Sequence, residues 1–119
     1  MNKLITVAVI DSGIYPHIDF KNRIVAFKDF VNGRKNAYDD CGHGTHVSGI
    51  IAGSGYASHG RIKGICPAAS LAGIKVLDRL GNGRIENVLD AAGWIISHQK
   101  DLNIRVVNHI WRKGKPHCS

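Results

Sequence analysis

Two short stretches of the sequence carry residues that could act together in hydrolysis. Asp11 follows the apolar, β-branched residues 4–10 and begins the turn sequence Asp-Ser-Gly. His43 lies in the sequence Gly-His-Gly-Thr-His-Val-Ser-Gly at residues 42–49. In a hydrolytic triad, an aspartate accepts a hydrogen bond from one imidazole nitrogen, and the imidazole takes the proton of the nucleophile. Asp11 and His43 are therefore candidates for the orienting acid and the general base.

Both stretches resemble the subtilisin-like serine proteases, or subtilases. In that family the triad aspartate lies in Asp-[Ser/Thr]-Gly after a strand, and the triad histidine is the first His of His-Gly-Thr-His-Val-x-Gly. Asp11 precedes His43, which agrees with the family's order of Asp, then His, then Ser. The resemblance extends from about residue 4 to residue 108. It implies a partial three-layer α/β fold with a parallel sheet flanked by helices, and serine-type endopeptidase activity on peptide or protein substrates.

The resemblance also implies a substrate-binding segment. Leu77, Gly81, Asn82 and Gly83 match the family's Val-Leu-x-x-x-Gly-x-Gly stretch, whose backbone pairs with an extended peptide as an added strand. A plain Gly-Asn-Gly turn that leads into a helix is an equally open interpretation of these residues.

The resemblance to the subtilases ends after Asn108. Residues 1–108 are expected to be the N-terminal part of a catalytic domain, and residues 109–119 a basic tail unrelated to it. The family's Asn-x-Ser-x-Gly segment, its oxyanion asparagine and its Gly-Thr-Ser-Met-Ala-like segment are not found in the 119 residues. A truncation or a reading-frame shift would explain this: a shift by one base after Asn108 permits Asn-Ile-Ser-Gly-Gly. The isolated chain is therefore expected to be inactive.

Two other interpretations belong to different functional classes. The chain could be a non-catalytic peptide- or protein-binding fragment that a complementing chain completes. It could instead be a small metal-binding protein, because Cys41, His43, His46 and His59 are residue types that bind zinc. The glycines and the Thr-His-Val continuation fit the protease motif better, so we predict no metal site. Calcium is common in subtilases, but no oxygen-rich loop indicates it here, so no cofactor is predicted.

The candidate pair needs a scaffold, and the hydrophobic pattern supplies one. Strands are predicted at residues 4–10, 23–27, 71–77 and 104–107, and helices at residues 43–52 and 85–99. Strands alternating with helices indicate a parallel α/β sheet, in which ligands lie beyond the carboxyl ends of the strands. Asp11 and the Gly81 turn are thus expected at one rim. Asp39 and Asp40 are predicted to be solvated turn residues, and the last strand is expected to leave an open apolar edge.

Composition limits the remaining possibilities. A chain of 119 residues forms one domain at most, and its stability should be modest. The net charge of +7 comes from scattered basic residues, without the basic stripe or aromatic platform of a nucleic-acid-binding protein. No segment is long enough to span a membrane, and the apolar run at residues 4–10 is too short for a secretory signal. We therefore predict a cytoplasmic protein without nucleic-acid or membrane partners.

Overall fold

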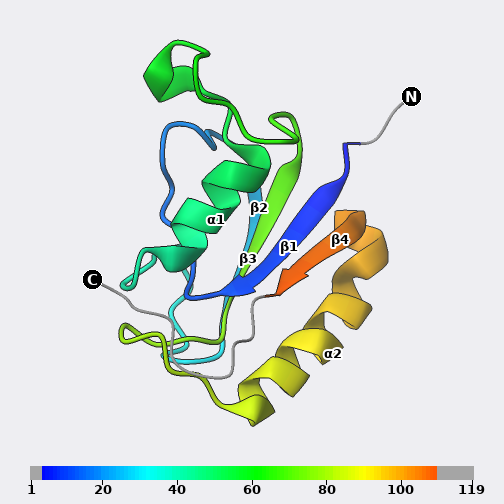
Figure 1. Cartoon of the computed structure of the whole chain (residues 1–119). Coiled ribbons are helices and arrows are strands. Elements are labelled where there is room, and N and C mark those ends of the chain that lie inside the picture. Colours follow the sequence, from blue (N-terminus) through cyan, green and yellow to red (C-terminus); the bar gives the residue numbers. More distant parts are fainter. Residues whose placement is uncertain (1–3, 110–119) are drawn as a thin grey trace.

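A computed structural model describes residues 4–109. The chain forms a parallel four-stranded sheet with helices packed against it (Figure 1). The strands are β1 Thr6–Asp11, β2 Ile24–Asp29, β3 Ser70–Lys75 and β4 Ile104–His109. The helices are α1 His43–Ala52 and α2 Ile85–Leu102, and the 3-10 turn η1 Tyr56–Ser58 follows α1. This arrangement confirms the predicted α/β class.

The strand that ends at Asp11 lies inside the sheet, whose order is β2-β3-β1-β4. All six residues of β1 are buried. Val7 and Val9 belong to the apolar cluster that includes Ala52 of α1, whereas Ala8 and Ile10 belong to the cluster that includes residues of α2. Successive side chains of a strand point to opposite faces, so the two helices cover opposite faces of the sheet. This double coverage accounts for the apolar residues 7–10, whereas Leu4 and Ile5 of the predicted strand lie before β1 and are exposed.

The two helices lie close to their predicted positions, and a residue in the left-handed conformation flanks one end of each. Helix α1 begins at His43 as predicted, after Gly42 in the left-handed conformation with φ 95°. Helix α2 extends to Leu102, three residues beyond the predicted end at residue 99, and buries Ala91 and Ile95. Asn103 caps the C-terminus of α2, because its left-handed backbone (φ 53°) directs its N–H to two carbonyls of the last turn.

Strands β2 and β4 form the two edges of the described sheet. Strand β2 is displaced from the predicted residues 23–27, since it runs from Ile24 to Asp29. Strand β4 pairs only with β1 within the described sheet, so the predicted edge position of the last strand is confirmed. Val106 and Val107 on this edge are 46% and 48% exposed.

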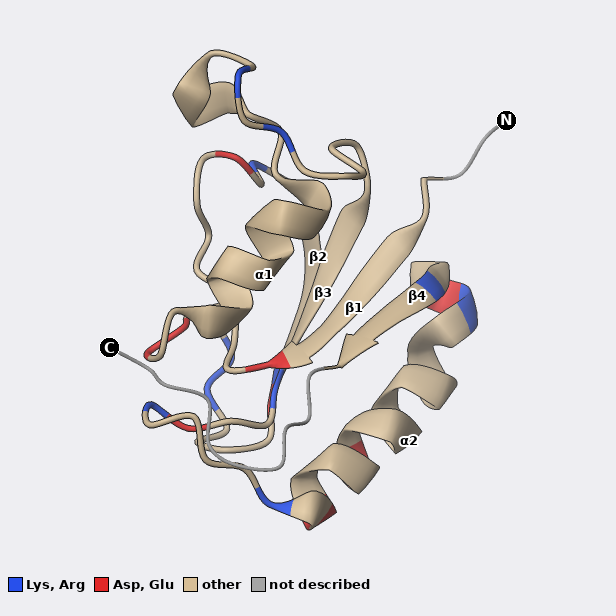
Figure 2. Cartoon of the chain, in the orientation of Figure 1, with Lys and Arg blue, Asp and Glu red and all other residues tan. Residues whose placement is uncertain are grey.

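The carboxyl ends of the strands meet at one rim of the sheet. Asp11 pairs in register with Lys75, and the loop after β3 carries the Gly81 turn. Figure 2 shows acidic segments at the tip of β1 and in the loop that leads into α1, whereas basic segments are spread over several loops and ends of elements.

Among residues 4–109, no helix combines the length and the apolar character needed to cross a membrane.

Candidate active site

The imidazole of His43 faces the carboxylate of Asp11. Its Nδ1 atom lies 2.9 Å from each carboxylate oxygen. The side chain of Asp11 is only 1% exposed, whereas that of His43 is 21% exposed. An ionised carboxylate can only accept hydrogen bonds, so Nδ1 carries the proton and Nε2 is left as the basic nitrogen. The structure therefore brings together the two residues that the sequence singled out.

Backbone contacts hold Asp11 at the carboxyl end of β1. The N–H groups of Val76 and Leu77 donate to the Asp11 carbonyl oxygen at 2.9 and 3.2 Å. The N–H of Ser12 donates to Oδ1 of the Asp11 carboxylate at 2.7 Å. The chain turns immediately after this strand, so the carboxylate is fixed at the rim where the next loop begins.

Close backbone packing holds His43 in place. A Cβ atom on Gly44 would lie 2.1 Å from the carbonyl oxygen of Gly13, which is well inside contact distance. Only glycine at position 44 lets α1 approach the Asp-Ser-Gly turn this closely. Among the described residues, Nε2 of His43 has no hydrogen-bond partner. The arrangement can therefore accept a proton on Nε2 from a group that approaches the exposed side of the ring.

The prediction that Asp39 is a solvated turn residue was wrong. Its Oδ1 accepts hydrogen bonds from Ser12 Oγ (2.8 Å), Gly42 N (2.8 Å) and Cys41 N (3.2 Å). Its Oδ2 accepts hydrogen bonds from Thr45 N (2.8 Å) and Thr45 Oγ1 (2.6 Å). Burial acts to raise the pKa of Asp39, but the donors around it outweigh burial and hold this pKa below its usual value. The turn signal in the sequence gave no indication of this role.

Asp40 is not simply solvated either, because it pairs with a buried lysine. The Nζ atom of Lys75 is 2.6 Å from Asp40 Oδ1, 2.6 Å from the Ser12 carbonyl oxygen and 2.8 Å from the Leu77 carbonyl oxygen. The side chain of Lys75 is fully buried, whereas that of Asp40 is 32% exposed. A lysine within the apolar residues 71–77 was the available signal, because a buried ammonium group requires acceptors.

The predicted substrate-binding residues form a tight turn at the same rim as Asp11. Leu77 forms an antiparallel bridge with Gly83, and the Asp78 N–H donates to the Asn82 carbonyl at 2.8 Å. Gly81 is buried with φ 81°, a left-handed conformation that favours glycine. The Leu77 N–H reaches the carbonyl of Asp11, so this turn adjoins the candidate pair. Binding of substrate by Leu77, Gly81, Asn82 and Gly83 stays a prediction.

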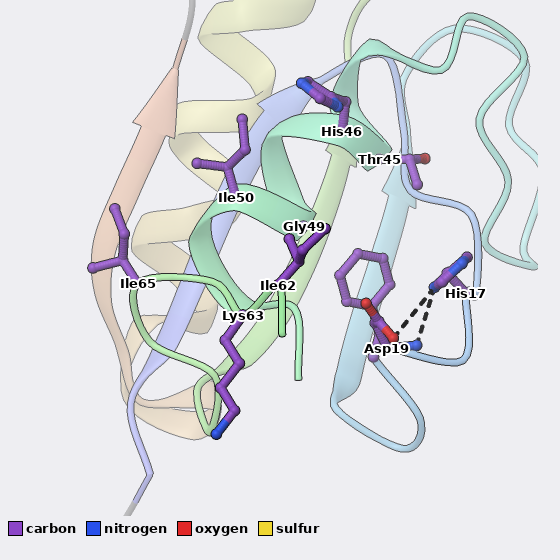
Figure 3. Close-up of a pocket in the computed structure, with 10 residues that line it drawn as sticks. His17, Asp19, Thr45, His46, Gly49, Ile50, Ile62, Lys63 and Ile65 are labelled. Atoms are coloured by element: carbon purple, nitrogen blue, oxygen red, sulfur yellow. Dashed lines mark hydrogen bonds and ion pairs between the residues drawn. The ribbon is translucent and has the colours of Figure 1, made fainter. Parts of the chain in front are cut away.

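A groove of about 490 Å³ lies along the outer side of α1 (Figure 3). His46, the second histidine of the motif, is exposed and lines this groove together with Ile50, Ile62 and Ile65. Neither Asp11 nor His43 lines this groove. Within residues 4–109, no three His, Cys, Asp or Glu side chains are grouped closely enough to hold a metal ion.

Comparison with known proteins gives consistent similarities. The sequence profile of the subtilase family matches residues 2–117. The chain is 46% identical over 99 residues to serine protease AprX of Bacillus subtilis strain 168. This match covers 83% of the chain and 22% of AprX. It is 39% identical over 106 residues to the major intracellular serine protease of the same strain, covering 84% of this chain and 33% of that protein.

A solved structure shares the architecture. The crystal structure of a cold adapted subtilisin-like serine proteinase superposes with a TM-score of 0.68 at 34% sequence identity. The superposition covers 78% of this chain and 32% of that chain. The chain thus spans about a third of that protein, and between 15% and 33% of the length of curated relatives. The family match continues beyond Asn108, and the boundary between residues 108 and 109 stays a prediction.

Proposed function

Because the chain belongs to the subtilase family, we propose that it carries the acid–base half of a subtilisin-like serine endopeptidase site. Asp11 is the orienting acid and His43 is the general base. The observation that carries this proposal is the contact of His43 Nδ1 with both oxygens of the buried Asp11 carboxylate, at 2.9 Å each. This contact fixes the ring with Nε2 on its free side.

Each residue has a defined part in peptide-bond hydrolysis. His43 takes the proton of a serine hydroxyl through Nε2 while the serine oxygen attacks the peptide carbonyl. The same nitrogen then returns the proton to the leaving amine, and an acyl-enzyme remains for water to hydrolyse. Asp11 stays ionised throughout and stabilises the imidazolium that forms beside it.

The proposal includes a substrate edge beside this pair. Leu77, Gly81, Asn82 and Gly83 would receive an extended peptide by backbone pairing. Their turn follows β3 and adjoins the Asp11 carbonyl through the Leu77 N–H, and this proximity to the candidate pair supports the proposed edge. We also propose a cytoplasmic location for the chain. The names of its relatives do not decide between locations, because one relative is named an extracellular protease and another an intracellular protease. Fractionation of cells that express the chain tests the location.

We further propose that the chain of 119 residues hydrolyses no peptide by itself. The family's nucleophile and oxyanion segments are not among its residues, and no described hydroxyl contacts Nε2 of His43. Loss of the triad serine lowers turnover by about 10⁶-fold in subtilisin. A serine-reactive phosphonate probe should therefore leave the purified chain unlabelled. Labelling of the chain, or robust hydrolysis of a fluorogenic peptide, would contradict this part.

A chimera tests the roles of the pair directly. Residues 4–108 replace the matching segment of AprX, which supplies the remainder of its own chain. The chimera should hydrolyse the peptide and react with the probe, and His43→Ala should lower kcat by about 10⁶-fold. His46→Ala is the matched control on the same helix turn and should retain activity. An active chimera that tolerates His43→Ala would refute the proposal.

A further inference from the structure

We propose that Asp39 is the positioning residue that holds His43 against Asp11, a role that rests on the proposed function above. Asp39 touches neither member of the pair by a hydrogen bond. It instead binds the residue that follows Asp11 and the first turn of the helix that begins at His43. One carboxylate thereby links the two separate pieces of chain on which the pair is carried.

The first link runs through Ser12. The hydroxyl of Ser12 donates to Asp39 Oδ1 at 2.8 Å and accepts from the Gly44 N–H at 2.9 Å. Ser12 is fully buried. Because the ionised Asp39 can only accept, it fixes the direction of the Ser12 proton, which leaves the Ser12 lone pairs for Gly44. Gly44 directly follows His43, so this bond ties the base to the turn of the acid.

The second link reaches α1 itself. Thr45 donates both its N–H and its hydroxyl to Asp39 Oδ2, and the N–H of Gly42 donates to Oδ1. Gly42 directly precedes His43 in the chain, and Thr45 lies two residues after it. A negative charge beside the free N–H groups of a helix start is also favourable. Asp39 thus restrains the backbone on both sides of His43.

The neutral isostere cannot replace this carboxylate. In Asp39→Asn the amide has one acceptor oxygen and one NH2 group. In the native structure, however, hydrogen-bond donors surround both carboxylate oxygens, Oδ1 and Oδ2. Whichever way the amide is turned, its NH2 faces a backbone N–H. The backbone N–H groups of Cys41 and Gly42, or that of Thr45, must therefore lose their acceptor, although the size of the side chain is unchanged.

Nitrogen-15 NMR of the His43 ring in the chain of 119 residues tests the proposal. In the wild type, the Nδ1–H tautomer should dominate, with a protected Nδ1 proton. In Asp39→Asn the solvent exchange of this proton should rise by about tenfold, the effect expected when a hydrogen bond to a charged group is lost. Ser12→Ala removes only the first link and should give a smaller change in the same direction.

Asp29→Asn is the matched control for a merely structural effect. Asp29 also accepts backbone hydrogen bonds, from Val31, Asn32 and Arg34, and one from the Tyr38 hydroxyl, but it has no hydrogen bond to residues 39–45. The Asp29→Asn substitution should lower the free energy of unfolding and leave the NMR signals of the His43 ring unchanged. Wild-type signals in a folded Asp39→Asn, or in Ser12→Ala if Asp39→Asn does not fold, would overturn the positioning role.

A wild type that lacks the Nδ1–H tautomer would instead count against the proposed function. The two failures are therefore distinguishable: the first is seen in the variants while the wild type shows the expected tautomer, and the second is seen in the wild type itself.

Discussion

Gly44 lies directly against Gly13, so that a Cβ atom on Gly44 would be 2.1 Å from the Gly13 carbonyl oxygen and 3.2 Å from Cβ of Asp11. The backbones of the two candidate motifs come into close contact at these two glycines. Gly13 has φ 124°, and a Cβ atom there would lie 2.2 Å from the Tyr38 carbonyl oxygen. The distance between His43 and Asp11 therefore depends on the absence of side chains at Gly13 and Gly44.

Gly44→Ala should separate His43 from Asp11. The helix must move away to relieve the clash with Gly13, and we expect a loss of about 1–3 kcal/mol in the free energy of unfolding. Gly49→Ala on the same helix meets nothing within 4 Å and should instead raise the free energy of unfolding by about 0.5–1 kcal/mol. Urea unfolding and the His43 ring signals check both variants; equal behaviour of the two would contradict the packing argument.

Lys75→Met should destabilise the rim where the pair lies. The substitution keeps most of the buried volume but removes the donor shared by Asp40 and the carbonyls of Ser12 and Leu77. Asp40 is partly exposed and can be solvated, whereas the buried carbonyls lose their partner, so we expect a loss of about 2–4 kcal/mol. Asp40→Asn is the milder control. Chemical unfolding measures both, and a Lys75→Met chain as stable as the wild type would refute this role.

Ser48→Ala should stabilise the chain. The Ser48 side chain on α1 is fully buried, and its hydroxyl has no hydrogen-bond partner. Alanine removes this unsatisfied group and favours the helix, so the free energy of unfolding should rise by about 1 kcal/mol. Ser97→Ala on α2 is the control, because the Ser97 hydroxyl is exposed and bonds to the Gly93 carbonyl. Thermal unfolding that shows destabilisation by Ser48→Ala would indicate a hidden partner.

Tyr38 should make the stability depend on alkaline pH. Burial, together with the hydrogen bond that its hydroxyl donates to Asp29, raises the pKa of Tyr38 from 10.0 to about 12. The folded state therefore prefers the neutral phenol. The stabilisation is fully present below pH 10 and is lost as the pH rises through about 12. The difference in unfolding free energy between the wild type and Tyr38→Phe should be constant below pH 10 and shrink above it. A difference that grows above pH 10 would contradict this prediction.

The positions of the strands and helices were largely readable from the sequence. The apolar run that ends in Asp11 indicated a doubly covered strand, and the spacing of apolar residues indicated α2. The ends shifted by a few residues, as at β2 and α2, because capping and pairing with neighbouring elements decide where an element stops. Glycine-rich motifs around Asp11 and His43 identified the pair itself.

The sequence by itself thus identified Asp11 and His43 as the candidate pair and indicated that a parallel α/β sheet carries them. Only the tertiary structure decided how the pair is held. Asp39 and Asp40 looked like exposed turn residues, and Lys75 looked like a member of an apolar strand. The reason is physical: hydropathy and turn signals describe neighbours along the chain. Two of the acceptors of Lys75, the Ser12 carbonyl and Asp40, and the Ser12 hydroxyl that donates to Asp39 come from distant segments, which meet only when β1, β3 and the start of α1 pack together.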